Sequence, residues 1–244
     1  MRIPDDRGGR RGSVKGAGIA ATACVALLFG TAAWTQPSPA EGLHCAGTQV
    51  SVHGIGGAEA ETACQGAIDA VTFLAALGLN TSAPVEVHVV DRLPRVPPGQ
   101  KAFGCHAKSE QRVYMLTFAE CAASGLASAF PVDLAVYRSL VAHEVAHHVA
   151  SANFRVESPT RVAHEYIAYV TMFSTMAADA RERILGRYAG EGFVSEREIG
   201  LTMYMVDPHR FGTNAYRHFT QPRGGSPFIE RILSGRALTV EDPE

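Results

Sequence analysis

Residues 141–148 read Val-Ala-His-Glu-Val-Ala-His-His and contain the pattern HExxH at His143, Glu144 and His147. The surrounding run is rich in alanine and leucine, which favour a helix. Residues four apart lie on one face of a helix, so the imidazoles of His143 and His147 can bind one metal ion. Glu144 is then left pointing toward a water molecule at that ion. HExxH also occurs by chance, so the prediction of a metal site depends on a third ligand elsewhere in the chain.

A third ligand is expected downstream of His147, because a catalytic zinc ion takes three protein ligands and keeps one position open. A metzincin carries that ligand six positions after the second histidine, with a glycine halfway. Asn153 and Ala150 stand at these places, which disfavours the metzincin pattern. Glu165 lies within the next predicted helix and is the better prediction. Small side chains would let the two helices pack closely: Ala142, Ala146, Ala150, Ala168 and Thr171.

With His143, His147 and Glu165, the chain resembles the gluzincins, thermolysin-like metallopeptidases with HExxH on one helix and a ligand glutamate on the next. The resemblance covers residues 111–178. It implies that these three side chains bind one Zn²⁺ ion and that Glu144 is the general base. The implied reaction is the hydrolysis of peptide bonds by a metal-activated water.

Two positions depart from the fuller thermolysin pattern, which has asparagine before the ligand glutamate and aspartate four residues after it. His164 and Tyr169 stand there in this chain. The aspartate orients a ligand histidine, so the resemblance leaves that role unassigned. The compact spacing is closer to the minimal gluzincins, small proteases with a short sheet and two metal helices.

The resemblance also implies how a substrate binds. In the minimal gluzincins, the strand before the active helix pairs with an extended peptide, and residues 111–118 occupy that place here. We therefore expect a peptide or protein substrate along strand 111–118. A hydrogen-bond donor for the developing oxyanion is also expected, and the sequence leaves four possibilities open: Tyr204, His209, Tyr216 and His218.

A second interpretation belongs to a different class of protein. The chain could be a non-catalytic envelope protein that keeps the zincin-like fold, and its zinc, as a binding or structural module. Glu144 is not needed to hold zinc, so its presence favours the enzyme. His148 is expected to face solvent or to act as a capping neighbour, because it projects about a quarter turn away from His147.

The start of the chain has the pattern of an export signal. Residues 16–34 carry no charge and follow a basic leader that includes Arg10 and Arg11, a pair that loosely resembles a twin-arginine signal. Cleavage is predicted after Ala33 or Ala40. The alternative is an uncleaved membrane anchor, because the uncharged run is at the lower limit for a span. We predict an exported, periplasmic or extracellular protein, with residues 1–40 as signal peptide and flexible junction.

Composition fits one globular domain over residues 41–244. The 244 residues are 46% apolar and 19% charged, with a net charge of -2. These values allow a sizeable core. No basic stripe remains after the leader, so no nucleic-acid partner is expected, and the oligomeric state is not predictable.

The cysteines predict disulfides in an exported chain. Of five cysteines, Cys24 lies in the signal core. The other four allow three pairings, and we favour the local ones, Cys45 with Cys64 and Cys105 with Cys121, because short loops close at lower entropic cost. A four-cysteine zinc site is disfavoured, since no pair has CxxC spacing.

Hydrophobic periodicity predicts an α+β fold with a small N-terminal sheet and helix, two packed metal-binding helices and a helical C-terminal part. Predicted strands cover residues 48–53, 84–90 and 111–118. Predicted helices cover residues 58–79, residues 132–152 with Pro131 at the start, and a stretch that opens at Ser158-Pro159 and reaches about residue 178. Further helical runs are expected at residues 195–206, 209–219 and 227–233.

Overall fold

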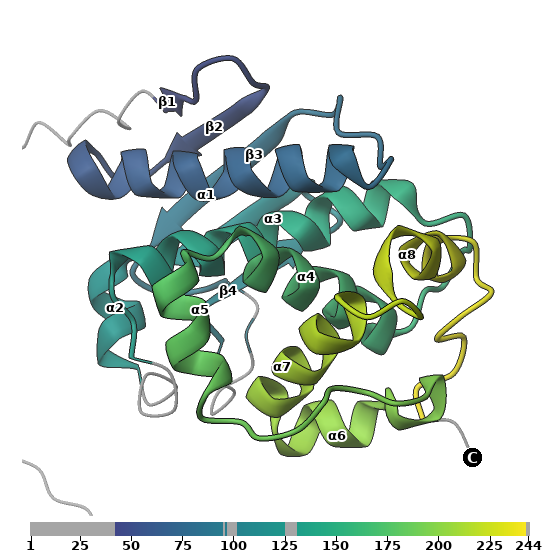
Figure 1. Ribbon diagram of the computed structural model, residues 1–244. Coiled ribbons are helices and arrows are strands. Elements are labelled where there is room, and N and C mark those ends of the chain that lie inside the picture. Colours follow the sequence, from purple (N-terminus) through teal and green to yellow (C-terminus); the bar gives the residue numbers. More distant parts are fainter. Residues whose placement is uncertain (1–41, 95, 97–101, 125–130, 243–244) are drawn as a thin grey trace, which may run out of the picture. The chain divides into compact units, whose positions relative to one another are not determined.

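The structure is a computed structural model that describes residues 42–94, 96, 102–124 and 131–242 (Figure 1). The predicted signal segment, with its cleavage sites, lies outside the described residues. Strands in the first half and helices in the second confirm the predicted α+β class. Among the residues described, no helix combines the length and the apolar character that crossing a membrane would require.

The strands are β1 Leu43–His44, β2 Val50–His53, β3 Val85–Val90, β4 Gly104–Ala107 and β5 Arg112–Leu116. The helices are α1 Gly57–Ala76, α2 Phe118–Ala123, α3 Leu134–Asn153, α4 Arg161–Thr175, α5 Ala178–Leu185, α6 Leu201–Val206, α7 Pro208–Phe219 and α8 Gly225–Leu233, with a 3-10 turn at Glu196–Glu198.

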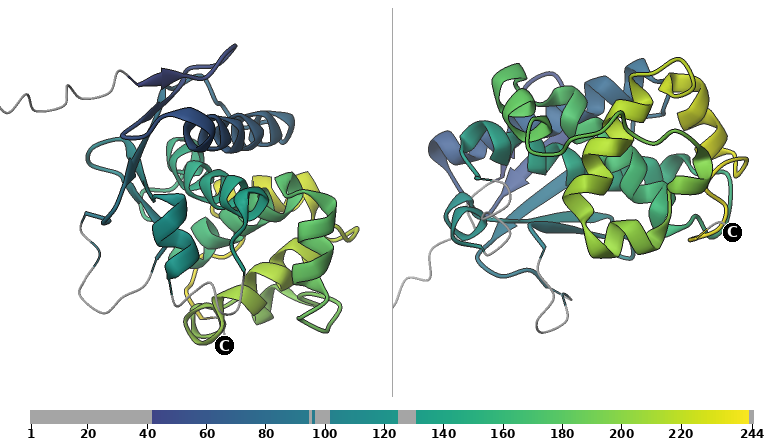
Figure 2. Two further views of the ribbon diagram at one scale, coloured as in Figure 1. Left: turned by 90° about the vertical axis from the view of Figure 1, so that its left-hand side faces the viewer. Right: turned by 60° about the horizontal axis from the view of Figure 1, so that its bottom comes forward.

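The five strands form one sheet in the order β1-β2-β3-β5-β4. β2, β3 and β5 run parallel, and the short edge strands β1 and β4 run antiparallel to their neighbours. Side chains alternate between the faces of a strand. The buried face carries Val50, Val52, Val85, Val87, Val89, Val113 and Met115. α1 and α3 pack on this face, so the helices lie on one side of the sheet (Figure 2).

Two long helices, α1 and α3, pack closely against each other. A Cβ added at Gly66 of α1 would lie 2.2 Å from the carbonyl oxygen of Arg138 in α3, so only glycine allows this approach. α3 is also packed against α4, which leaves α3 buried between its neighbours. The core therefore fixes the direction of the helix that carries HExxH.

Side-chain caps set the starts of the metal helices, and they correct two predicted boundaries. Asp133 accepts a hydrogen bond from the Val136 amide at 2.8 Å, so α3 begins after Asp133 and Pro131 is not its first residue. Thr160 accepts from the Ala163 amide at 3.1 Å and caps α4 in place of Ser158. Both caps satisfy amides that lack a partner within the helix.

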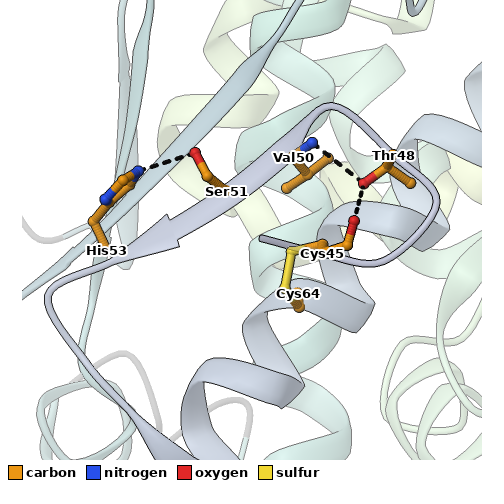
Figure 3. The surroundings of a disulfide bond; sticks show 6 residues. All are labelled: Cys45, Thr48, Val50, Ser51, His53 and Cys64. Carbon is orange, nitrogen blue, oxygen red and sulfur yellow. Dashed lines mark hydrogen bonds between the residues drawn. A yellow bond between two sulfur atoms is a disulfide. The ribbon is translucent and has the colours of Figure 1, made fainter. Parts of the chain in front are cut away.

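The predicted disulfide between Cys45 and Cys64 is confirmed (Figure 3). It joins the turn between β1 and β2 to the middle of α1, with the two Cα atoms 5.5 Å apart. Thr48 steadies the same turn by donating its hydroxyl to the Cys45 carbonyl at 2.9 Å. A disulfide is consistent with an oxidising, exported compartment.

The predicted disulfide between Cys105 and Cys121 is wrong, because neither residue is in a disulfide. Cys105 pairs with Tyr114 across β4 and β5, and cross-strand partners point to the same face. Its Sγ therefore belongs to the face away from the helices, whereas Cys121 is fully buried and donates to the Leu116 carbonyl. Proximity in sequence does not reveal that the sheet separates the two thiols.

Candidate metal centre

Three side chains from α3 and α4 converge at one point. The Nε2 atoms of His143 and His147 lie 3.2 Å apart. Glu165 brings its Oε2 atom to 3.5 Å from the first nitrogen and 3.8 Å from the second. All three ligand atoms lie within 4.8 Å of one another, so the group could hold a metal ion. The sequence prediction placed these three side chains together, and the structure does so.

The chemistry of this group fits a cation. Glu165 is nine-tenths buried, and its Oε2 atom has no hydrogen-bond partner. Burial would raise the pKa of Glu165, but its buried neighbours His147, His143 and Tyr204 favour the ionised carboxylate and hold the pKa at about 2. Burial lowers the pKa of His147 to about 3, so its imidazole is neutral and able to ligate. An ionised carboxylate between buried imidazoles is a site that a positive ion would stabilise.

Glu144 lies beside the group and is also buried, with 8% of its surface exposed. Burial and the charge of Glu165 raise its pKa to about 7, against the opposing effect of His143. β4 runs directly past this carboxylate. A Cβ added at Gly104 would lie 2.5 Å from the Glu144 Cγ atom, so glycine at this position makes room for the glutamate.

The group opens into a cleft of about 610 Å³ between β4, α3, α4, α6 and the start of α7. Tyr204 and His209, two of the four predicted oxyanion donors, line it. The other two, Tyr216 and His218, do not line this cleft. Tyr216 packs its ring against Phe173 at 5.6 Å, and His218 hydrogen-bonds Tyr166 at 2.6 Å inside the core.

Tyr169 occupies the place where the gluzincin pattern has an aspartate that orients a ligand histidine. Its ring lies edge-on to the His143 imidazole, with centroids 4.6 Å apart. The Nδ1 atom of His143 is buried without a hydrogen-bond partner. A Cβ at Gly212 would lie 2.3 Å from the Tyr169 ring, so this glycine leaves room for the phenol. Aromatic packing thus replaces the carboxylate contact at His143.

His148 corrects another expectation. It does not face solvent but is buried, with its ring edge-on to His106 of β4 at 5.1 Å. His106 lines the cleft and lies 3.4 Å from the Ser151 hydroxyl through Nδ1. The sequence pattern did not single out His106, because β4 is too short to be recognised as a strand.

The expected substrate strand, residues 111–118, has a different place in the sheet. β5 pairs with β3 along one edge and with β4 along the other, so its backbone has no open edge for a peptide. β4 is the edge strand, and Gly104, Cys105 and His106 line the cleft. An extended ligand at this site would pair with β4.

The starts of α4 and α6 are both capped by residues from the end of the described chain. The Glu241 carboxylate accepts from the amides of Arg161 at 2.8 Å and Val162 at 3.3 Å. Asp242 accepts from the Thr202 amide at 2.8 Å and from its hydroxyl at 3.0 Å. These caps hold in place the two helices that carry Glu165 and Tyr204.

A family model, Family of unknown function (DUF6639), matches residues 50–242. The match spans every element from β2 to α8 and therefore includes both helices of the metal centre. No curated protein and no solved structure matches the chain.

Proposed function

We propose that this chain, which belongs to the family of unknown function DUF6639, is an exported zinc-dependent peptidase related in mechanism to the minimal gluzincins. One observation carries the proposal. Two imidazole nitrogens and a carboxylate oxygen converge beside a buried glutamate in an open cleft. A structural metal site has no need of that fourth side chain or of access to solvent.

The donor set favours zinc over other divalent cations. Two histidines and one glutamate are the ligands of a catalytic zinc site that keeps a position open. Magnesium and calcium prefer sites made of oxygen atoms alone. His143, His147 and Glu165 would hold the ion, which would supply a Lewis acid that acidifies water and polarises a carbonyl group.

Glu144 acts as the proton carrier in this proposal. Its carboxylate takes a proton from the attacking water and then gives it to the leaving amine. Burial has already raised the affinity of Glu144 for a proton, and a cation nearby would pull its pKa back down. Tyr204 is the oxyanion donor that the geometry favours, since its phenol reaches the ligand Glu165 from α6.

The peptide backbone binds along β4. The strand lies at the edge of the sheet beside Glu144, so an added strand would place a scissile bond next to the general base. This replaces strand 111–118 as the proposed substrate edge.

The test compares the purified wild-type chain with Glu144→Gln. We expect one zinc ion per chain in both proteins, because Glu144 is not a ligand. Only the wild type should cleave a mixed peptide library, with a loss in the variant of at least about a hundred-fold. Cleavage is followed by mass spectrometry.

A zinc-loaded wild type that cuts no peptide would refute the peptidase and support the non-catalytic envelope module instead. Glu165→Ala should lose zinc, and Glu157→Ala, its matched control outside the cleft, should keep it. The reverse result would reject Glu165 as the third ligand.

A further inference from the structure

The cleft has an uneven charge distribution on either side of the metal centre. Among the described residues that line it, the carboxylates are Glu144 and Glu165, both at the centre itself. Two cations, Lys108 and Arg161, also line it. The charge available to a ligand away from the centre is therefore positive.

Both cations lie on one side of the centre. α4 returns along α3, since His164 lies near His147 and Phe154 at the end of α3, whereas Tyr169 contacts His143 nearer its start. Arg161 begins α4 and is therefore on the side of Phe154. Lys108 follows β4 on the same side, because β4 runs from Gly104, beside Glu144, to His106, which lies next to Ser151 near the end of α3.

Neither cation is in an ion pair with a carboxylate of the described residues. The Lys108 carbonyl accepts hydrogen bonds, but its ammonium group is exposed and makes none among the contacts described. The Arg161 guanidinium contacts the Met205 sulfur at 4.0 Å. The Glu241 carboxylate accepts hydrogen bonds from the backbone amides of Arg161 and Val162. Both charges are thus available to a ligand.

The opposite side of the centre is apolar. Leu140, one turn before His143, lines the cleft together with Met172, two turns after Glu165, and with Phe103 at the start of β4. A ligand that crosses the centre therefore meets cations on one side and hydrocarbon on the other.

We infer that the substrate is an acidic peptide with a carboxylate on the Lys108 and Arg161 side of the scissile bond and an apolar side chain on the other. The inference rests on the proposed peptidase function and specifies its substrate class. A carboxylate can accept charge-assisted hydrogen bonds from both side chains, and a basic residue at the same place would be repelled.

The first measurement uses cleavage. Zinc-loaded full-length protein digests matched peptides that differ only by Glu or Gln at each position around the scissile bond. We expect a kcat/KM about five-fold higher for glutamate at one or two positions on a single side. The preference should shrink at high salt. Lys108→Gln with Arg161→Gln should abolish this preference, so that the glutamate and glutamine peptides are cleaved with equal kcat/KM. Arg112→Gln, an exposed cation on the opposite face of the sheet, is the matched control and should retain it.

The second measurement uses binding and does not depend on catalysis. Fluorescence anisotropy with zinc-loaded Glu144→Gln should show tighter binding of the glutamate peptides than of the matched glutamine peptides. The same protein that also carries Lys108→Gln and Arg161→Gln should bind both kinds of peptide equally. Cleavage without any acidic preference would overturn this inference and leave the peptidase standing. Preferential binding without cleavage by the wild type would sustain the acidic ligand and refute the peptidase. Equal or absent binding of both peptides overturns the inference.

Discussion

At the scale of single residues, Tyr169 is the clearest departure from the gluzincin pattern. It packs on His143 where that pattern has an aspartate, and the His143 Nδ1 atom is left without a partner. A carboxylate that accepts from Nδ1 would make the imidazole a stronger ligand. An ion held by this group would therefore have a less basic histidine ligand than in the gluzincin pattern.

We expect Tyr169→Asp to bind zinc about ten-fold more tightly, because the new carboxylate can accept from His143. Tyr169→Phe, which keeps the ring contact, should bind zinc as the wild type does. Competition with a chromogenic chelator measures both affinities. A folded Tyr169→Asp with unchanged zinc affinity would show that the aromatic contact already orients His143 fully.

The pH dependence of stability should reveal Glu144 in the metal-free protein. Burial raises its pKa from 4.5 to about 7, so between these values the folded protein holds a proton that the unfolded chain has lost. The free energy of unfolding should therefore fall as the pH rises through this window. Glu144→Gln lacks the titrating group. The wild type should lose about 2 kcal/mol more than the variant between about pH 5 and about pH 7.

Urea unfolding of both proteins in the presence of a chelator measures this difference. Parallel stability curves for the two proteins would mean that Glu144 is hydrated in solution and that its pKa is near the ordinary value.

Helix spacing and the gluzincin resemblance predicted that His143, His147 and Glu165 lie together, because HExxH and a glutamate on the next helix depend on helix geometry. Gly104 and His106 could not be predicted in the same way. They reach the site through the pairing of β4 with β5, which local sequence does not encode. The separation of Cys105 from Cys121 has the same origin.

At the scale of elements, β4 is held against the metal helix by one glycine. Gly104→Ala would force either β4 or the Glu144 side chain to move, since the new Cβ would be 2.5 Å from Glu144 Cγ. We expect peptidase kcat to fall at least about ten-fold with zinc content unchanged, because none of the three ligands is touched. Gly56→Ala, where nothing lies within 4 Å, is the matched control and should be active. Equal activity of both variants would remove β4 from the proposed machinery.

The Cys45–Cys64 disulfide ties β1 to α1 and should contribute measurably to stability. It spans 19 residues, for which the loss of unfolded-chain entropy corresponds to about 3 kcal/mol. Cys45→Ser with Cys64→Ser should lower the free energy of unfolding by about that amount. Cys105→Ser serves as the control and should change it by less than about 1 kcal/mol. Denaturant unfolding under oxidising conditions measures the free energy of unfolding of both variants. Equal losses of stability would contradict the Cys45–Cys64 disulfide.

Elements with strong periodicity were predicted to within a few residues, among them α1, β3 and α3. Elements without it were missed: β1, β4, α2 and α5. β4 has four residues and begins with glycine, which carries no strand preference. α2 begins at Phe118 because the Thr117 side chain caps it, so the predicted strand 111–118 extended too far.

At the scale of the whole described chain, the order of strands could not be predicted. Local patterns identify β3 and β5, but their adjacency and the place of β4 at the edge depend on contacts between distant segments. The sequence therefore could not reveal that β5, the predicted substrate strand, is paired on both of its edges.

Distant segments also meet at the caps of α4 and α6. Glu241→Ala with Asp242→Ala should remove the acceptors of three backbone amides and one hydroxyl group and cost about 2 kcal/mol of stability. Hydrogen exchange should speed up at the starts of α4 and α6 and stay unchanged in α1. Glu191→Ala, at an exposed site, is the control. Equal protection in all three proteins would show that water replaces the caps.

The Glu241 cap joins residues 80 positions apart, so it bears on the order in which the parts of the chain fold. Contacts of long sequence separation form late, because a large loop must close before they contribute. Helix α4 can therefore pack on α3 before Glu241 accepts from the amides of Arg161 and Val162. The position of Glu165 is fixed only when the segment that contains Glu241 has docked. A chain interrupted after α7 would possess His143, His147 and Glu144 yet lack the Glu241 cap, so assembly of the candidate metal centre is coupled to the completion of folding.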